Sequence, residues 1–201
     1  GSFSSRSQMW MATARMMLAN PLTGVGAGAW EVQIPLYQRT YTLPVTALRY
    51  FTVYGPRQRP DMAFTRFISA LKVGAEVVIY GDGHQSRDFT YIDDVVEANI
   101  LSMYKGPAGM VMNIGGGSHI SLMNVVEMMG RIMGVKPSIR HDKPQKGDAR
   151  DTWADISRAR RYLGYHPKTD IEEGLRKMIA AFGESRFTRD FPTPQKVFPA
   201  K

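Results

Sequence analysis

Cysteine is absent from this 201-residue sequence. Without thiols the chain cannot form disulfides, thiolate zinc sites, iron–sulfur clusters or a cysteine nucleophile. Histidine is scarce as well, and no metal-ligand spacing connects the four histidines, which are His84, His119, His141 and His166. We therefore predict neither a metal site nor thiol chemistry.

Long apolar runs are also missing. No stretch approaches the roughly 18 residues that a membrane-spanning helix needs. The start of the sequence lacks the basic, apolar and small-residue order of a secretory signal peptide. These features predict no membrane partner and a cytoplasmic location.

Acidic residues are outnumbered by basic ones, with 18 Asp and Glu against 26 Lys and Arg and a net charge of +8. Such a balance favours a polyanionic partner. Nucleic-acid-binding proteins usually carry a basic stripe or a spaced basic and aromatic motif. Neither is present, so no nucleic-acid partner is predicted. A phosphorylated small molecule explains the local clusters equally well, which lie at Arg57/Arg59 and at Arg158/Arg160/Arg161.

Strand and helix patterns alternate over residues 43–182. A β-branched and aromatic run at residues 43–53 predicts a strand buried on both faces, and shorter strands are expected at residues 77–80 and 111–114. Helices are expected where apolar residues recur at i, i+3, i+4 and i+7 after a capping residue. Their expected starts are Asp61, Asp93 or Asp94, Ser121, and Thr169, which forms a capping box with Glu172. This alternation predicts an α/β fold.

Residues 1–40 differ from the rest of the chain. They contain four charged residues, two tryptophans and a methionine-rich run without helical or alternating period. Neither a helix nor a strand is expected there. The predicted organisation is an atypical segment over residues 1–40, a folded part over residues 41–182 and a C-terminal tail over residues 183–201.

Glycine-rich motifs occur at two places. The first, Gly24–Ala29, has the letters of the dinucleotide fingerprint G-x-G-x-x-A, which normally joins a strand to a helix. Here the preceding residues 20–23 do not predict a strand, Pro35 interrupts the segment where the helix should run, and no acid stands roughly 20 residues further on. The second, Gly115–Gly117, either approaches a phosphate or forms a simple turn.

Two loops carry candidate ligand-binding residues. In residues 55–62, Arg57 and Arg59 stand between two prolines at the carboxyl end of a predicted strand, where open α/β sheets place ligands. Their guanidinium groups suit carboxylate or phosphate. In residues 80–94, Arg87 can reach a phosphate and the aromatic residues can form a wall for a base or sugar.

Adjacent carboxylates end the second loop. Asp93 and Asp94 face different ways on a helix and therefore make a poor acid/base pair. Helix capping and first-turn charge are the stronger interpretation of both.

Four segments, taken in order, resemble the nucleotide-sugar epimerases and dehydratases of the extended short-chain dehydrogenase/reductase family. They are LRYFTVYGPRQRPDMAF at residues 48–64, VVIYGDGHQSRDFTYIDDVVEA at 77–98, NIGGG at 113–117 and KGDARDTWADISRARRYLGYHP at 146–167. The likeness covers residues 37–182, and UDP-glucuronate 4-epimerases look most similar. It implies the C-terminal part of a Rossmann-type sheet plus the small α/β domain that binds the nucleotide-sugar.

The resemblance also implies site residues. Arg87 matches the arginine on the diphosphate, Asp148 an acid near the ribose, and residues 78–80 the strand beside the base. Thr52 and Arg59 match groups that meet the sugar carboxylate in glucuronate enzymes. With Arg57 from the loop argument, the predicted substrate-binding residues are Thr52, Arg57, Arg59, Val78, Tyr80, Arg87 and Asp148.

The catalytic pair of that family is missing from this sequence. Members of the family oxidise their sugar with NAD, while the tyrosine of a Tyr-x-x-x-Lys pair moves the proton. None of the nine tyrosines is followed by a lysine four positions later. The glycine-rich half that holds NAD in that family is not recognised in the sequence either. We therefore predict a truncated homologue with no catalytic residue and no cofactor bound by the isolated chain, which binds UDP or a UDP-sugar without turnover.

Two other interpretations stay open. Another chain could supply a missing half and complete a split NAD-dependent UDP-sugar 4-epimerase, which NAD binding would favour. Alternatively, the chain is a self-associating remnant that binds nothing. A homo-oligomer is expected, because the apolar strand at residues 45–53 would have an unpaired edge that the methionine-rich start or a second copy must cover.

Overall fold

The computed structural model describes residues 30–42, 44–145 and 147–184. They divide into two compact units. Unit 1 combines the chain up to Arg49 with Val96–Ile114 and Asp155–His166, and unit 2 combines Tyr50–Val95, Gly115–Ala154 and the chain from Pro167. The Gly24–Ala29 motif, most of the atypical segment and nearly all of the predicted tail lie outside the described residues.

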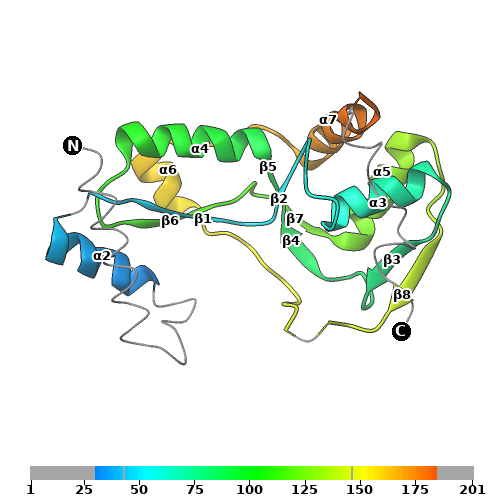
Figure 1. The fold of residues 1–201 in the computed structure, drawn as a ribbon, viewed down its shortest axis with the longest axis horizontal. Helices are drawn as coiled ribbons and strands as arrows, with labels where there is room; N and C mark the ends of the chain where they lie inside the picture. Colours follow the sequence, from blue (N-terminus) through cyan, green and yellow to red (C-terminus); the bar gives the residue numbers. More distant parts are fainter. Residues whose placement is uncertain (1–29, 43, 146, 185–201) are drawn as a thin grey trace. The chain divides into compact units, whose positions relative to one another are not determined.

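Helices and strands alternate along the described chain, which confirms the α/β class (Figure 1). The elements are α2 (Trp30–Tyr41), β1 (Ala47–Tyr50), β2 (Val53–Tyr54), α3 (Ala63–Lys72), β3 (Val77–Tyr80), β4 (Ser86–Asp88), β5 (Thr90–Tyr91), α4 (Ile92–Lys105), β6 (Val111–Ile114), β7 (His119–Ser121), α5 (Leu122–Met133), β8 (Ile139–Asp142), α6 (Ser157–Leu163) and α7 (Ile171–Glu184). Strands β4, β5, β7 and β8 and helix α6 were not expected from the sequence.

The described strands associate in pairs: β1 with β6, β2 with β5, β3 with β8 and β4 with β7. The β2/β5 and β3/β8 pairs are parallel, whereas β4/β7 is antiparallel. In β3/β8, Val78 lies opposite Arg140 and Tyr80 lies opposite Asp142. The carboxyl ends of two neighbouring parallel strands therefore meet at Tyr80 and Asp142.

Unit 2 has its core between helices α3, α5 and α7 and the strands beside them, a group that is easy to follow in Figure 1. Helix α5 follows the sequence pattern closely. Val125, Val126 and Met129 are completely buried. The Ser121 hydroxyl accepts the N–H of Asn124 at 3.2 Å, and Gly134 ends the helix with a φ of 70°, so the predicted cap and stop are both confirmed.

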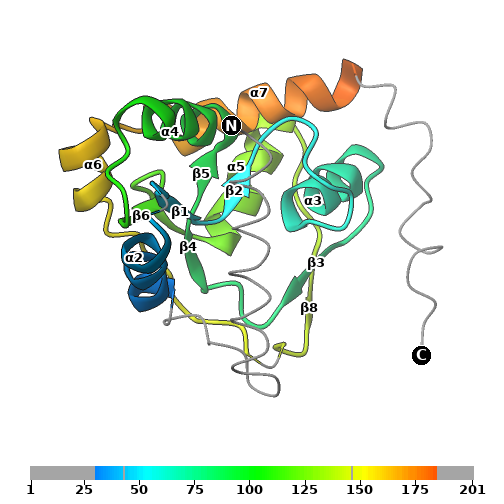
Figure 2. The same cartoon turned by 60° about the vertical axis from the view of Figure 1, so that its left-hand side comes forward.

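Unit 1 contains strand β6 packed against helices α6 and α2, as Figure 2 shows. Helix α2 corrects the expectation that residues 1–40 contain no helix. It forms despite an internal proline, Pro35, and a weak apolar period. Contact with β6 supplies the stabilisation that the local pattern lacks, since packing contributes most of the stability of a short helix.

The predicted long strand at residues 43–53 is wrong. The chain forms two short strands, β1 and β2, which belong to different pairs. Between them, the Thr52 carbonyl accepts the N–H of Thr90 at 2.9 Å. Composition predicted the strand character correctly, but the change of pairing partner depends on β5 and β6, which are distant in sequence.

Two predicted helix caps are also wrong. Asp61 pairs with Arg59 at 2.8 Å, and Met62 precedes α3 without a side-chain cap. At α7 the carboxylate of Asp170 accepts the N–H of Glu173 at 2.8 Å, so Asp170 takes the capping place expected of Thr169. The Thr169 N–H donates instead to a distant carboxylate, that of Asp94, at 3.3 Å.

Within the described ranges, no helix combines the length and apolar character that crossing a membrane requires. The same residues contain no group of three or more histidine, aspartate or glutamate side chains arranged for a metal ion.

Candidate functional site

Strand β4 places Arg87 at the centre of the candidate site. Its guanidinium donates from Nη2 to the Asp148 carboxylate at 2.5 Å and from Nη1 to the carbonyls of Ser86 and Arg150 at 2.8 and 3.1 Å. The Arg87 side chain is only 15% exposed. The structure thus brings together two residues that lie 61 positions apart and that the sequence analysis had selected separately.

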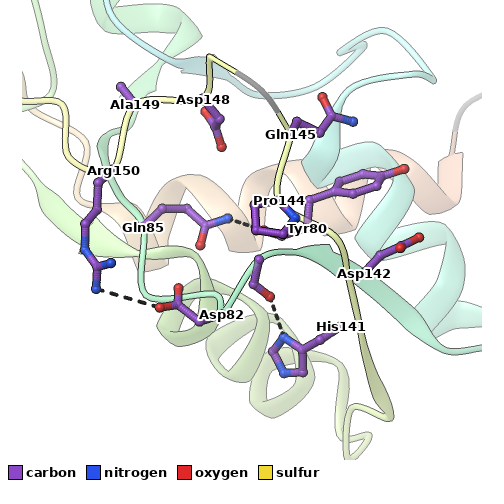
Figure 3. Close-up of a pocket in the computed structure, with 11 residues that line it drawn as sticks. Tyr80, Asp82, Gln85, His141, Asp142, Pro144, Gln145, Asp148, Ala149 and Arg150 are labelled. Carbon is purple, nitrogen blue, oxygen red and sulfur yellow. Dashed lines mark hydrogen bonds and ion pairs between the residues drawn. The ribbon is translucent and has the colours of Figure 1, made fainter.

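A cleft of about 620 Å³ lies beside this pair, at the carboxyl ends of β3 and β8 (Figure 3). This is the edge of a parallel strand pair where α/β proteins bind ligands. Asp148 and Tyr80 both line it. The other lining residues come from the loop after β3 and from β8 with its C-terminal loop: Gly81, Asp82, Gln85, His141, Asp142, Pro144, Gln145, Ala149 and Arg150.

Hydrogen bonds fix the loop at the mouth of the cleft. Gln85 donates its side-chain amide to the Tyr80 carbonyl at 2.7 Å, and the His141 Nδ1 lies 2.8 Å from the Gly81 carbonyl oxygen. Asp82 accepts the N–H of His84 at 2.9 Å, and this hydrogen bond lowers the Asp82 pKa below its ordinary value. The ionised Asp82 faces Arg150 at 3.7 Å, which gives the cleft both signs of charge (Figure 3).

Ser86 anchors the segment that carries Asp148. Its N–H donates to the Arg150 carbonyl at 2.9 Å, and its own carbonyl accepts from Thr152 at 3.1 Å. The Ser86 hydroxyl donates to the Asp151 carboxylate and lies 2.6 Å from His119 Nε2. Sequence reasoning missed Ser86, because a buried serine beside an arginine has no signal until the distant segment is seen beside it.

The side chain of Asp88 binds to the Gly115–Gly117 turn. Asp88 is completely buried, and its carboxylate accepts the N–H groups of Gly116 at 2.7 Å and Ala154 at 3.2 Å. Burial raises the Asp88 pKa, and these hydrogen bonds partly oppose the rise. Because the Asp88 carboxylate already accepts the Gly116 N–H, this N–H is not available to a pyrophosphate. We therefore assign no NAD contact to the turn.

Five of the seven predicted residues do not line the cleft. Arg87 lies beside it, bonded to Asp148. Val78 lies earlier in β3, and Thr52 lies between β1 and β2, where its carbonyl bonds to β5. Arg57 lies in an exposed turn with a left-handed φ of 64°, which is unusual for a residue other than glycine. Arg59 is exposed and paired with Asp61.

Known proteins resemble this chain in sequence over most of its length. The model of the NAD dependent epimerase/dehydratase family matches residues 28–115. A UDP-glucuronate 4-epimerase of Thermodesulfobacterium geofontis (strain OPF15) is 42% identical over 162 residues, which are 80% of this chain and 49% of that protein. This chain belongs to the NAD-dependent epimerase/dehydratase family. Its α/β fold and the resemblance found in its motifs are thereby confirmed.

Solved structures of the epimerase/dehydratase family share the fold. The UDP-glucuronic acid 4-epimerase of Bacillus cereus, in complex with UDP-glucuronic acid and NAD, superposes with a TM-score of 0.73 at 38% identity, covering 77% of this chain and 50% of that one. A dTDP-glucose 4,6-dehydratase of Bacillus anthracis, in complex with NAD, gives the same TM-score at 26% identity, with 78% and 50% covered.

These relatives correct the cofactor prediction. The related structures were determined with NAD, and this finding contradicts the prediction that the isolated chain binds no cofactor. That prediction rested on the rejection of Gly24–Ala29 as a dinucleotide fingerprint and on the missing Tyr-x-x-x-Lys pair. The chain spans about half the length of the curated relatives that it matches.

Proposed function

We propose that the protein binds UDP or a UDP-sugar of the UDP-glucuronate type in the cleft of unit 2. The observation that carries the proposal is the Arg87–Asp148 pair at the edge of that cleft. In this proposal Arg87 contacts the diphosphate, Asp148 accepts from the ribose hydroxyls, and Val78 and Tyr80 of β3 lie beside the base. Relatives crystallised with UDP-glucuronic acid support the ligand class.

The geometry of Arg87 suits a diphosphate. A guanidinium has five N–H donors, and the three hydrogen bonds that Arg87 makes within the protein leave donors for a phosphate oxygen. Because those bonds hold the side chain in place, binding a phosphate loses little side-chain entropy.

Calorimetric titration with UDP tests this proposal. Arg87→Ala should weaken UDP binding by roughly tenfold or more, since hydrogen bonds to charged groups are the strong ones. Arg131→Ala is the matched control, because it removes one positive charge from an exposed position on α5 in the same unit. Absence of UDP binding at millimolar concentration, or equal binding by both variants, would contradict the proposal.

We further propose that the turn after β2 selects an acidic sugar. Thr52, Arg57 and Arg59 would contact the sugar carboxylate, although Arg59 must first leave Asp61. Arg57→Gln and Arg59→Gln should therefore reduce the preference for UDP-glucuronate over UDP-glucose in the same titration. A ratio of affinities that neither variant changes would remove these residues from the site.

The chemical role we propose is substrate binding rather than proton transfer. No Tyr-x-x-x-Lys pair is present in the 201 residues, so the chain does not itself offer the family's proton-transfer group. Incubation with NAD and UDP-glucuronate should yield no UDP-galacturonate. Product formation that persists after repurification would contradict this role.

Self-association is proposed through the exposed face of α4. Val96, Ile100, Met103 and Tyr104 are between 49% and 82% exposed, and their spacing places them on one side of the helix. A second copy would bury this apolar face. Ile100→Glu with Met103→Glu should yield monomers in sedimentation, whereas Val73→Glu, at another exposed apolar position, should not. A monomeric unmodified protein would refute the proposal.

A further inference from the structure

A second hollow, of about 600 Å³, lies wholly within unit 1. It is bounded by α6, by the turn that leads into β6, and by Pro35 of α2, elements that can be followed in Figure 2. None of the residues that line it belongs to the cleft beside Arg87. Any ligand in this hollow would therefore be bound independently of the proposed UDP site.

Helix α6 presents one basic face to the hollow. Arg158, Arg161 and Tyr162 all line it, and their i, i+3, i+4 spacing puts them on the same side of the helix. Ala159 and Leu163 are completely buried on another side. Packing of these two apolar residues therefore fixes which side of α6 lines the hollow.

Acidic residues balance the charge of this face only in part. No aspartate or glutamate lines the hollow, and no carboxylate in the described part of the chain forms an ion pair with Arg158 or Arg161. The acid that precedes α6, Asp155, accepts the N–H of Ser157 at 2.9 Å, and this hydrogen bond lowers the Asp155 pKa more than the charge of Arg158 does. Like charges one helical turn apart destabilise a helix, and a bound anion would relieve this repulsion.

Both arginines are already oriented. Arg158 donates to the Val111 carbonyl at 3.4 Å, and the Arg161 guanidinium lies 5.4 Å from the centre of the Tyr162 ring. Paired guanidinium groups match the geometry of phosphate oxygens. Next to them, Pro35 and Met110 offer an apolar wall.

We propose that this hollow is an anion site for the phosphate group of a small phosphorylated molecule. Arg158 and Arg161 hold the phosphate, and the apolar wall accepts the organic part of a phosphate ester. The site concerns unit 1 alone and does not depend on UDP binding by unit 2.

The test is calorimetric titration of the full chain with inorganic phosphate and with phenyl phosphate, in an Arg87→Ala background that removes the contribution of the cleft. The double variant Arg158→Gln/Arg161→Gln should weaken phosphate binding by about tenfold. The control Arg160→Gln/Lys105→Gln removes two positive charges from exposed positions of unit 1 outside the hollow, and should change the affinity less than twofold.

Tighter binding of phenyl phosphate than of inorganic phosphate would identify an ester as the ligand, and equal binding would identify free phosphate. Either result supports a phosphate site if the two double variants differ. An equal loss in both double variants would show only a general effect of charge and would overturn the proposal. So would the absence of phosphate binding by the parent protein at millimolar concentration, with circular dichroism confirming that each variant is folded.

Discussion

Thr90 carries a buried hydroxyl that makes no hydrogen bond among the described residues, and it is completely inaccessible to solvent. A buried polar group without a partner destabilises the folded state. We expect Thr90→Val to raise the free energy of unfolding by about 1 kcal/mol, measured by urea denaturation.

Thr65→Val provides the comparison. Thr65 is also buried, but its hydroxyl donates to the Gln58 carbonyl at 3.2 Å. The same substitution there should lower the free energy of unfolding by about 1 kcal/mol. Changes of the same sign at both positions would contradict the assignment of an unpaired hydroxyl to Thr90.

Ser86 gives a pH-dependent prediction. Its hydrogen bond lowers the Asp151 pKa below the ordinary value of 3.8. A carboxylate with a lowered folded-state pKa stabilises the protein above its unfolded pKa, and this contribution disappears as the pH falls through the folded pKa. Ser86→Ala should therefore be less stable than the parent protein near neutral pH, with part of the difference disappearing below about pH 4.

Asp151→Asn tests the cause, because it removes the titrating group. In that background, the Ser86→Ala effect on the urea midpoint should be independent of pH between about pH 3 and pH 5, the range in which carboxylates titrate and imidazoles do not. The range stops there because the Ser86 hydroxyl also contacts His119. A pH dependence that survives in the double variant would assign the effect to another group.

At the scale of elements, α7 is held against the strands by a close approach at Gly174. A Cβ there would overlap the ring of Tyr54, which is 2% exposed and surrounded by Phe64, Phe89 and Tyr91. Overpacking costs roughly 1–3 kcal/mol, whereas the helix propensity of alanine returns at most about 1 kcal/mol. Gly174→Ala should therefore be destabilised by up to about 2 kcal/mol, measured by thermal unfolding.

Ala180→Gly measures the propensity contribution alone, at an exposed position of the same helix. It should lower the free energy of unfolding by up to about 1 kcal/mol. A Gly174→Ala protein more stable than the parent would show that the Tyr54 ring can move and that the aromatic cluster is loosely packed.

At the scale of the whole molecule, the proposed nucleotide site belongs to one unit. UDP at 100 times its dissociation constant should raise the free energy of unfolding by about 2.7 kcal/mol. Hydrogen exchange should slow at the cleft, in Tyr80–Gln85 and around Ala149–Arg150, which belong to unit 2. Slower exchange confined to the residues of unit 1 would contradict the proposed position of the site.

The sequence, mainly through its resemblance to a family, proposed part of the candidate site in advance. Arg87, Asp148 and Tyr80 were selected from the sequence, and the structure brings them to one cleft and its edge. Thr52, Arg57 and Arg59 were selected in the same way and lie outside that lining. A motif identifies residue types suited to a ligand, but it carries no information about which of them share a surface in the folded protein.

The sequence alone determined the elements whose stability is local. Helix α5 followed its apolar period and its Ser121 and Gly134 ends, because capping and periodicity act within a few residues. The tertiary structure decided everything that depends on distant partners. It divided the predicted strand between β1 and β2, supported α2 around Pro35, and engaged Ser86 with Asp151. Pairing and burial join residues that are far apart in sequence, so local patterns cannot specify them.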